Sequence, residues 1–166
     1  VTELMQYALE KADVLPIEAK SLMAGIFLDT KSFNIRTGER TFESAAFLQR
    51  LGADTMEVKR LLQNDFQDTV SKYQIIKSSR LYRKEIAIAA LNSATNRILA
   101  AQAADEMLTI TDVYASFVIS QIDSKNVNIS ARSYGKINVQ LIMEKLGGGG
   151  HQNMAAVQLS DVTVEQ

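Results

Sequence analysis

The 166-residue sequence predicts an α/β protein in two parts: a group of helices, then a small β-α-β-β-α-β domain whose mixed sheet is covered by helices on one face. Helix-start signals and a helical apolar period recur through the first seventy-odd residues, and short apolar runs alternate with a helical pattern from residue 85. The composition, 46% hydrophobic and 22% charged, is typical of globular proteins and excludes disordered and fibrous classes. We place the parts at 1–75 and 85–166, with a linker at 76–84.

Four helices are expected in the first part, at residues 2–11, 16–28, 41–52 and from 54 into the seventies. Pro16 suits a first helical turn, Thr41 is expected as an N-cap, and Asp54 opens a capping box. The second helix is hydrophobic around its whole circumference from Leu22 to Leu28, so it requires apolar partners on every side. Three amphipathic helices cannot supply that cover. We therefore expect this part to belong to a larger domain that continues upstream or in another chain.

The second part follows a basic connector. Residues 72–84 carry five basic residues and no acid, which is typical of a solvated linker. The expected elements are then a strand at 85–91, a helix at 96–108, strands at 116–122 and 127–133, a helix at 137–146 and a strand at 155–159. Asp123 to Asn126 suit a tight hairpin turn between the two middle strands. This order gives the β-α-β-β-α-β domain.

Charge and residue types exclude several functions. Eighteen basic and nineteen acidic residues leave a net charge of −1, too little to hold a long polyanion by counterion release alone. The absence of cysteine excludes disulfides, thiolate metal sites and cysteine nucleophiles, and the single histidine excludes a multi-histidine metal cage. No apolar run is long enough to cross a bilayer, and the first ten residues do not resemble a signal peptide.

Four consecutive glycines form the strongest local signal, and the only histidine follows them. Gly147, Gly148, Gly149 and Gly150 come directly after a predicted helix. Successive glycine N–H groups can turn to one side and bind an anion such as phosphate; the alternative is a helix C-cap at Gly147 followed by a flexible loop. His151 would then donate a hydrogen bond to a phosphoryl oxygen or transfer a proton, or have a structural role only.

Polar residues end the strand that leads toward this loop. Alternation places Ser130 and Arg132 on one face of the strand and Ala131 and Ser133 on the other. Arg132 could bind a phosphate or carboxylate bidentately, or be an exposed strand-end arginine. Because the strand leads into the helix that ends in the glycines, Arg132 and the glycines could face one cleft.

Asp29 closes the apolar helix at 16–28. A carboxylate at the end of so apolar a segment is either paired, hydrogen-bonded or bound to a metal, or it lies at a solvated helix end. One carboxylate and one histidine cannot build a two-metal site by themselves.

These motifs together resemble the DHH phosphoesterase superfamily with its DHH-associated C-terminal domain, and most closely the GdpP-type cyclic-di-AMP phosphodiesterases. The matching stretches are Leu28 to Phe33, Arg36 to Gly38, Arg40 to Phe42, Gly52 to Asp54, Ser130 to Ser133 and Gly147 to His151. Two details favour the cyclic-dinucleotide branch: Lys31, where many relatives have glycine, and the three residues Gln152 to Met154 between the histidine and the following alanines.

The resemblance implies an enzyme in which two manganese ions activate water to open cyclic-di-AMP to linear pApA. It implies that Asp29 is a metal ligand, that His151 is catalytic, and that the substrate is bound by Ser130, Arg132, Ser133, Gly147, Gly148, Gly149, Gly150 and His151. It also implies a membrane-anchored parent protein with this part in the cytosol and without membrane contact of its own.

The sequence departs from the family in lacking an Asp-His-His triplet and an upstream Asp-x-Asp. The family would place both before Val1, so we expect the first part to be the remainder of a truncated DHH domain whose N-terminal half is missing. We expect this fragment alone to bind manganese weakly and to be inactive. Cleavage of short oligonucleotides or pAp, and a non-catalytic nucleotide-binding module, are the alternatives. Formation of a homodimer is left open.

Overall fold

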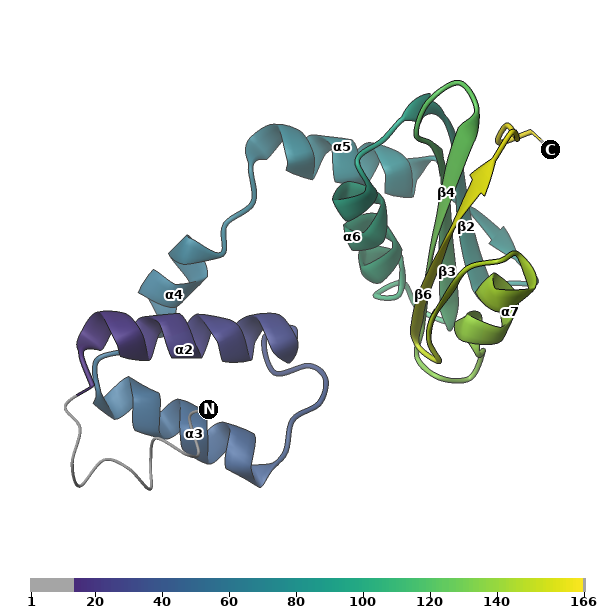
Figure 1. The fold of residues 1–166 in the computed structure, drawn as a ribbon. Coiled ribbons are helices and arrows are strands. Elements are labelled where there is room, and N and C mark those ends of the chain that lie inside the picture. Colours follow the sequence, from purple (N-terminus) through teal and green to yellow (C-terminus); the bar gives the residue numbers. More distant parts are fainter. Residues whose placement is uncertain (1–13, 166) are drawn as a thin grey trace. The chain divides into compact units, whose positions relative to one another are not determined.

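The computed structural model describes residues 14–165, so the helix predicted at 2–11 lies outside the described residues. The chain forms two compact units that divide between Asn64 and Asp65 (Figure 1). The first is helical and the second contains the sheet, so the predicted α/β class is confirmed.

The helical unit contains α2 (Pro16–Asp29), α3 (Glu39–Arg50) and α4 (Thr55–Leu61). Its core consists of Ala19 and Met23 from α2, Leu48 from α3, and Ala53 and Val58. Leu28, at the end of α2, is 67% exposed, which shows that the described residues cover only part of this helix. The apolar circumference that the sequence indicated is therefore not enclosed within the described residues.

Two helix boundaries differ from the prediction. α3 begins at Glu39 rather than after Thr41; the Gly38 N–H donates to Thr41 Oγ1 at 3.3 Å, so the threonine caps from inside the first turn. The helix expected from Asp54 into the seventies is two helices. Asp65 accepts from the backbone N–H of Gln67 at 2.7 Å, and so starts α5 (Phe66–Lys77) as a separate helix.

α5 belongs to the sheet unit, ten residues before the boundary that the sequence suggested. Its Ile75 is buried in the same cluster as Ala87 and Ala100. The segment expected as a linker, 76–84, contains the end of α5 and the strand β1 (Arg80–Tyr82). β1 pairs antiparallel with the next strand through a turn in which Arg83 and Lys84 have left-handed backbones.

The sheet has six described strands in the order β1-β2-β3-β4-β6-β5. The remaining strands are β2 (Ile86–Ala94), β3 (Ala115–Gln121), β4 (Asn126–Ser133), β5 (Gly149–His151) and β6 (Met154–Ser160). β2 and β3 are parallel, joined by α6 (Arg97–Met107), and the other described pairs are antiparallel. The predicted β-α-β-β-α-β order is present, with β1 and β5 as additional short edge strands.

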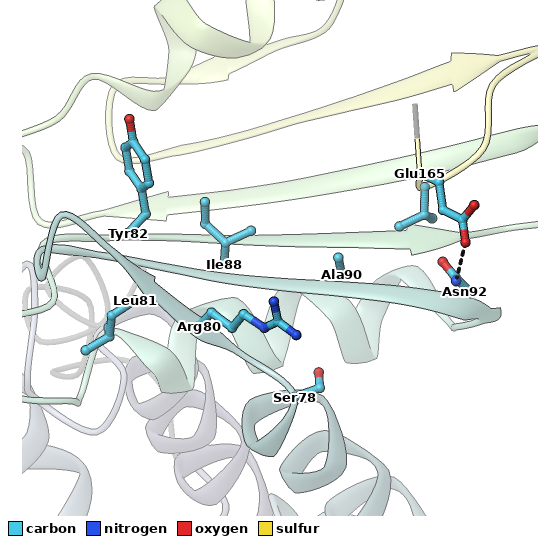
Figure 2. A pocket seen from close by; sticks show the side chains of 9 residues that line it. Ser78, Arg80, Leu81, Tyr82, Ile88, Ala90, Asn92 and Glu165 are labelled. Atoms are coloured by element: carbon cyan, nitrogen blue, oxygen red, sulfur yellow. Dashed lines mark hydrogen bonds between the residues drawn. The ribbon is translucent and has the colours of Figure 1, made fainter.

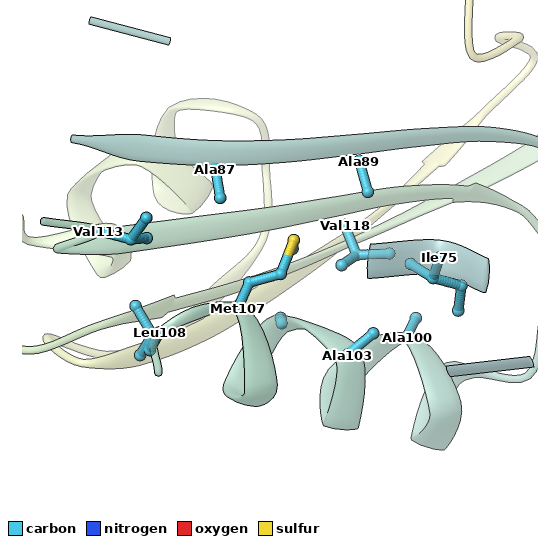
Figure 3. Close-up of a cluster of buried hydrophobic side chains, with 10 residues drawn as sticks. Ile75, Ala87, Ala89, Ala100, Ala103, Met107, Leu108, Val113 and Val118 are labelled. Atoms are coloured by element: carbon cyan, nitrogen blue, oxygen red, sulfur yellow. The ribbon is translucent and has the colours of Figure 1, made fainter. Parts of the chain in front are cut away.

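Helices cover both faces of the sheet, whereas the sequence predicted one. α6 and α5 pack on the face that carries Ala87, Ala89 and Val118, and Figure 3 shows these small side chains directed toward Met107 and the alanines of α6. The approach is close enough for Ser116 Oγ to donate to the Ala104 carbonyl at 2.6 Å. α7 (Val139–Lys145) packs on the opposite face, against side chains that alternate with the first set. This face includes Phe117, Val127, Ile129, Ala131, Ala155 and Val157.

Candidate functional site

Strand pairing gathers the predicted substrate-binding side chains on one face of the sheet. Ser130 pairs with Ala156, and Arg132 pairs with Met154. In turn, Ala156 pairs with Gly149, and Met154 pairs with His151. Side chains of paired residues point to the same face of a sheet. On its other side Arg132 pairs with Ser116, whose Oγ donates a hydrogen bond to α6. Ser130, Arg132, Gly149 and His151 therefore share the α6 face. We call the part of it on β4, β6 and β5 the site face.

Arg132 is held in place rather than exposed at the strand end. Its side chain is only 12% exposed, its Nε donates to Asp105 Oδ1 of α6 at 3.1 Å, and its Nη1 donates to the Ala131 carbonyl at 2.9 Å. A guanidinium has five N–H donors, so these two bonds leave others for a ligand. Asp105 thus fixes the orientation of a cation suited to phosphate.

The two serines beside Arg132 have different positions. Ser130 is buried on the site face, where its Oγ accepts from Asn128 Nδ2 at 3.1 Å. Ser133 is on the opposite face, where its Oγ accepts from the Gly135 N–H at 2.9 Å. The Ser133 side chain therefore shapes the turn after β4, and the structure does not bring it to the site face.

The four glycines do not form a single anion-binding loop. Gly147 has a left-handed backbone (φ +84°) and ends α7, and the Gly148 N–H donates to the Met143 carbonyl at 2.8 Å. Gly149 and Gly150 belong to the extended strand β5, paired with β6. The expected nest of successive N–H groups is therefore absent from this stretch, because the strand turns alternate groups in opposite directions.

Packing explains two of the remaining glycines but not the third. A Cβ on Gly148 would collide with the Ala156 carbonyl oxygen, and one on Gly150 would collide with the Met154 carbonyl oxygen. A Cβ on Gly149 would meet nothing within 4 Å. Its vacant side lies on the site face beside exposed Ala156. Between Ser130 and the edge of the sheet, the site face therefore carries only exposed backbone and the methyl group of Ala156.

His151 is exposed at the end of β5, and a tied hairpin fixes that end. The Gln152 carbonyl accepts from the Val139 N–H at 3.0 Å, and the Asn153 carbonyl accepts from the Ser133 N–H at 2.9 Å. The turn between β5 and β6 is therefore bonded to both ends of the segment that joins β4 to α7. His151 is held on the same face as Arg132.

Asp29 lies in the helical unit, at a solvated helix end. Its side chain is 73% exposed, and its Oδ1 is 3.5 Å from Arg36 Nη1. No group of three or more histidine, cysteine, aspartate or glutamate side chains that could hold a metal is found among residues 14–165. A single exposed carboxylate does not fit a two-ion site, so the described residues alone do not make one.

The backbone after Asp29 has an unusual conformation. Lys31, Ser32 and Phe33 are consecutive residues with left-handed φ values of 47°, 56° and 67°. Buried Thr30 fixes the turn, since its Oγ1 donates to the Ile26 carbonyl at 2.6 Å and accepts from the Phe33 N–H at 2.9 Å. Non-glycine residues adopt this region at a cost, and such conformations persist where the surroundings impose them. Glycine would adopt the same backbone without this cost.

A separate hollow lies elsewhere on the sheet unit. About 600 Å³ in volume, it lies over β1 and β2 on the sheet face opposite α6 (Figure 2). Arg80, Tyr82 and Ile88 line it, and Asn92 Nδ2 donates to Glu165 Oε1 across it at 3.3 Å. It contains none of the predicted site residues. Sequence reasoning missed it because Ile86 and Ile88 are typical of a covered strand.

Comparison with known proteins identifies the family. Residues 83–166 match the DHHA1 domain, and the chain belongs to this family. The resemblance to DHH phosphoesterases with their associated domain is thus confirmed.

Curated relatives match the whole chain. It is 48% identical to the cyclic-di-AMP phosphodiesterase GdpP of Geobacillus thermodenitrificans (strain NG80-2), over 99% of this chain and 25% of the relative. It is 46% identical to the cyclic-di-AMP phosphodiesterase PdeA of Listeria monocytogenes serotype 1/2a (strain 10403S), over 100% of this chain and 26% of the relative. The chain therefore spans about a quarter of the length of these relatives.

A solved structure shares the fold. An exopolyphosphatase-related protein from Bacteroides fragilis superposes with a TM-score of 0.76 at 18% identity, over 86% of this chain and 45% of that one. Among the described helices, none combines the length and apolar character needed to cross a membrane.

Proposed function

We propose that the chain is part of a longer metal-dependent phosphodiesterase that hydrolyses cyclic-di-AMP to linear pApA, and that the site face binds the substrate. The proposal rests on one observation above all: Arg132, fixed by Asp105, lies on the same face as Ser130, the open backbone at Gly149 and His151. The relatives' shared activity on cyclic-di-AMP supports the choice of substrate.

We assign a different role in substrate binding and catalysis to each of three residues of the site face. Arg132 binds non-bridging phosphoryl oxygens through its remaining N–H groups. Gly149, without a side chain, lets the sugar-phosphate lie against the strand. His151 donates a hydrogen bond to a phosphoryl oxygen, where negative charge grows during displacement.

The proposed manganese pair is not assembled by the described residues, which offer Asp29 alone. We propose that Asp29 is one ligand of the pair and that a longer chain supplies the others. We expect the 166-residue chain to bind manganese weakly and to release no pApA. Manganese-dependent turnover of cyclic-di-AMP by this chain would contradict that expectation.

The test of the proposed function is His151→Ala in a longer protein that carries this chain. Removing a hydrogen-bond donor that acts on the transition state should raise the activation free energy by about 2–4 kcal/mol and so lower kcat. The effect on KM should be smaller. Gln152→Ala, at the adjacent exposed position, serves as the control. Steady-state rates of pApA formation measure both, and an unchanged kcat in His151→Ala would remove the histidine from catalysis.

A non-catalytic nucleotide-binding module is the second candidate, favoured by the position of Asp29, which is 73% exposed and lies beside Arg36. Asp29→Asn in the longer protein separates the two. Hydrolysis that needs more manganese in this variant supports the enzyme, whereas binding of cyclic-di-AMP without hydrolysis in the unaltered protein supports the module.

A further inference from the structure

The site face continues past Ser130 to a second polar end. Asn128 of β4 pairs with Gln158 of β6 and with Ser120 of β3, so these side chains point to the same face as Ser130 and Arg132. Asn128 and Arg132 are four residue steps apart along β4, which is about 14 Å at ~3.4 Å per residue. Groups at the two ends can therefore contact different nucleotide units of one ligand.

The beginning of α6 lies over this second end. Arg97, the first residue of α6, donates from Nη2 to Gln158 Oε1 at 2.7 Å, and both side chains are exposed. The same helix bonds Arg132 through Asp105 near its other end. One arginine therefore lies at each end of the site face: Arg97 of α6, and Arg132 of β4, which α6 holds through Asp105.

Polar groups at the second end retain hydrogen-bonding capacity. Asn128 is only 5% exposed, and its bond to Ser130 Oγ uses Nδ2, which leaves Oδ1 as an acceptor. Gln158 accepts from Arg97 through Oε1, which leaves Nε2 as a donor. Ser120 Oγ is fully buried and has no hydrogen-bond partner within the described part of the chain. Buried polar groups ordinarily have hydrogen-bond partners, so the unpaired Ser120 Oγ is unusual and marks this end as able to bond a ligand.

We propose that Asn128, Gln158 and Arg97 form a subsite for the nucleotide unit that is not hydrolysed, and that its two amides select adenine. The proposal rests on the proposed function of the site face. One acceptor beside one donor matches adenine, whose exocyclic amine lies next to a ring nitrogen; the corresponding edge of guanine presents two acceptors. Arg97 supplies the positive charge for the second phosphate.

The experiment compares the binding of cyclic-di-AMP and cyclic-di-GMP to the 166-residue chain by isothermal titration calorimetry. We expect about tenfold tighter binding of cyclic-di-AMP to the unaltered chain. Gln158→Glu replaces the donor by an acceptor, and Gln158→Met removes it without adding charge. Both should abolish the preference. Gln63→Glu, an exposed position in the helical unit, is the charge-matched control and should preserve it.

The readout is the ratio of the two affinities, because a general loss of stability or charge would change both alike. If Arg132→Ala weakens cyclic-di-AMP binding while both Gln158 variants keep the original ratio, the subsite is overturned and the proposed function stands. Equal binding of the two ligands by the unaltered chain also overturns the subsite. Binding of neither ligand overturns the nucleotide-binding role of the site face, and the subsite with it.

Discussion

Consecutive glycines at the start of β5 and just before it meet different physical requirements. Gly148 and Gly150 face the backbone of β6 at distances that exclude a Cβ, and Gly150 also has a positive φ of 148°. Gly149, between them, faces open space on the site face. The sequence predicted a phosphate site at these glycines but could not distinguish them, because their directions depend on pairing with a strand that follows in the chain.

Alanine substitutions should separate these roles. Gly150→Ala should lower the free energy of unfolding by about 1–3 kcal/mol, because the added methyl meets backbone and the φ is strained. Gly149→Ala should leave the melting temperature unchanged and weaken cyclic-di-AMP binding, because the methyl occupies the floor of the site face. Thermal melts and calorimetric titrations check both; a Gly149→Ala variant that binds as tightly as the unaltered chain would contradict the assignment.

Arg132 should not be replaceable by lysine. Lysine retains the charge but lacks the planar guanidinium, which donates to Asp105 and to the Ala131 carbonyl at the same time. Arg132→Lys should therefore weaken cyclic-di-AMP binding by about 1.5–3 kcal/mol, the usual contribution of hydrogen bonds to a charged group. Arg80→Lys, in the hollow over β1 and β2, is the matched control. Equal losses of cyclic-di-AMP affinity in Arg132→Lys and Arg80→Lys would contradict a specific role of Arg132 in binding.

At the scale of elements, the longer strands and helices of the sheet unit could be predicted, and the two three-residue strands could not. β2, α6, β3, β4, α7 and β6 carry their own apolar patterns. β1 has three exposed residues, and β5 is mostly glycine, so each forms only because a neighbouring strand pairs with it. The break between α4 and α5 was missed for a related reason: the apolar period continues from Met56 to Tyr73, while the cap at Asp65 interrupts the backbone.

The cap at Asp65 should contribute measurably to stability. Its Oδ1 accepts from the N–H groups of Gln67 and Asp68 at 2.7 and 3.3 Å. Asp65→Ala should lower the free energy of unfolding of the sheet unit by about 1 kcal/mol, whereas Gln67→Ala should change it little. Urea denaturation measures both, and equal stabilities of the two variants would show that α5 does not depend on this cap.

At the scale of the whole molecule, the division of the chain follows burial rather than the charge pattern. The basic run at 72–84 is typical of a linker, yet Ile75 is buried in the core of the sheet unit, and residues 80–82 form a strand. Burial of one residue among side chains from β2 and α6 is a tertiary property, which composition alone cannot indicate. The same holds for Asp105, whose place beside Arg132 depends on how α6 packs.

Hydrogen exchange should distinguish the two units. Ile75→Ala should destabilise the sheet unit by about 2–5 kcal/mol through the cavity it leaves, and so raise exchange in β2 and α6 while α2 keeps its protection. Leu48→Ala, in the core of the helical unit, should do the reverse. A loss of protection in α2 upon Ile75→Ala would mean that the two units unfold together.

We propose that the face formed by β4, β6 and β5 binds a cyclic dinucleotide. Nuclear magnetic resonance titration of the ¹⁵N-labelled chain with cyclic-di-AMP tests it most directly, because each backbone N–H reports its own position. We predict saturable shifts at Ser130, Gly149 and His151 that Arg132→Ala abolishes. Shifts confined to Tyr82, Ile88 and Asn92, around the hollow on the opposite face, would contradict binding at the site face, as would an unchanged spectrum at saturating ligand.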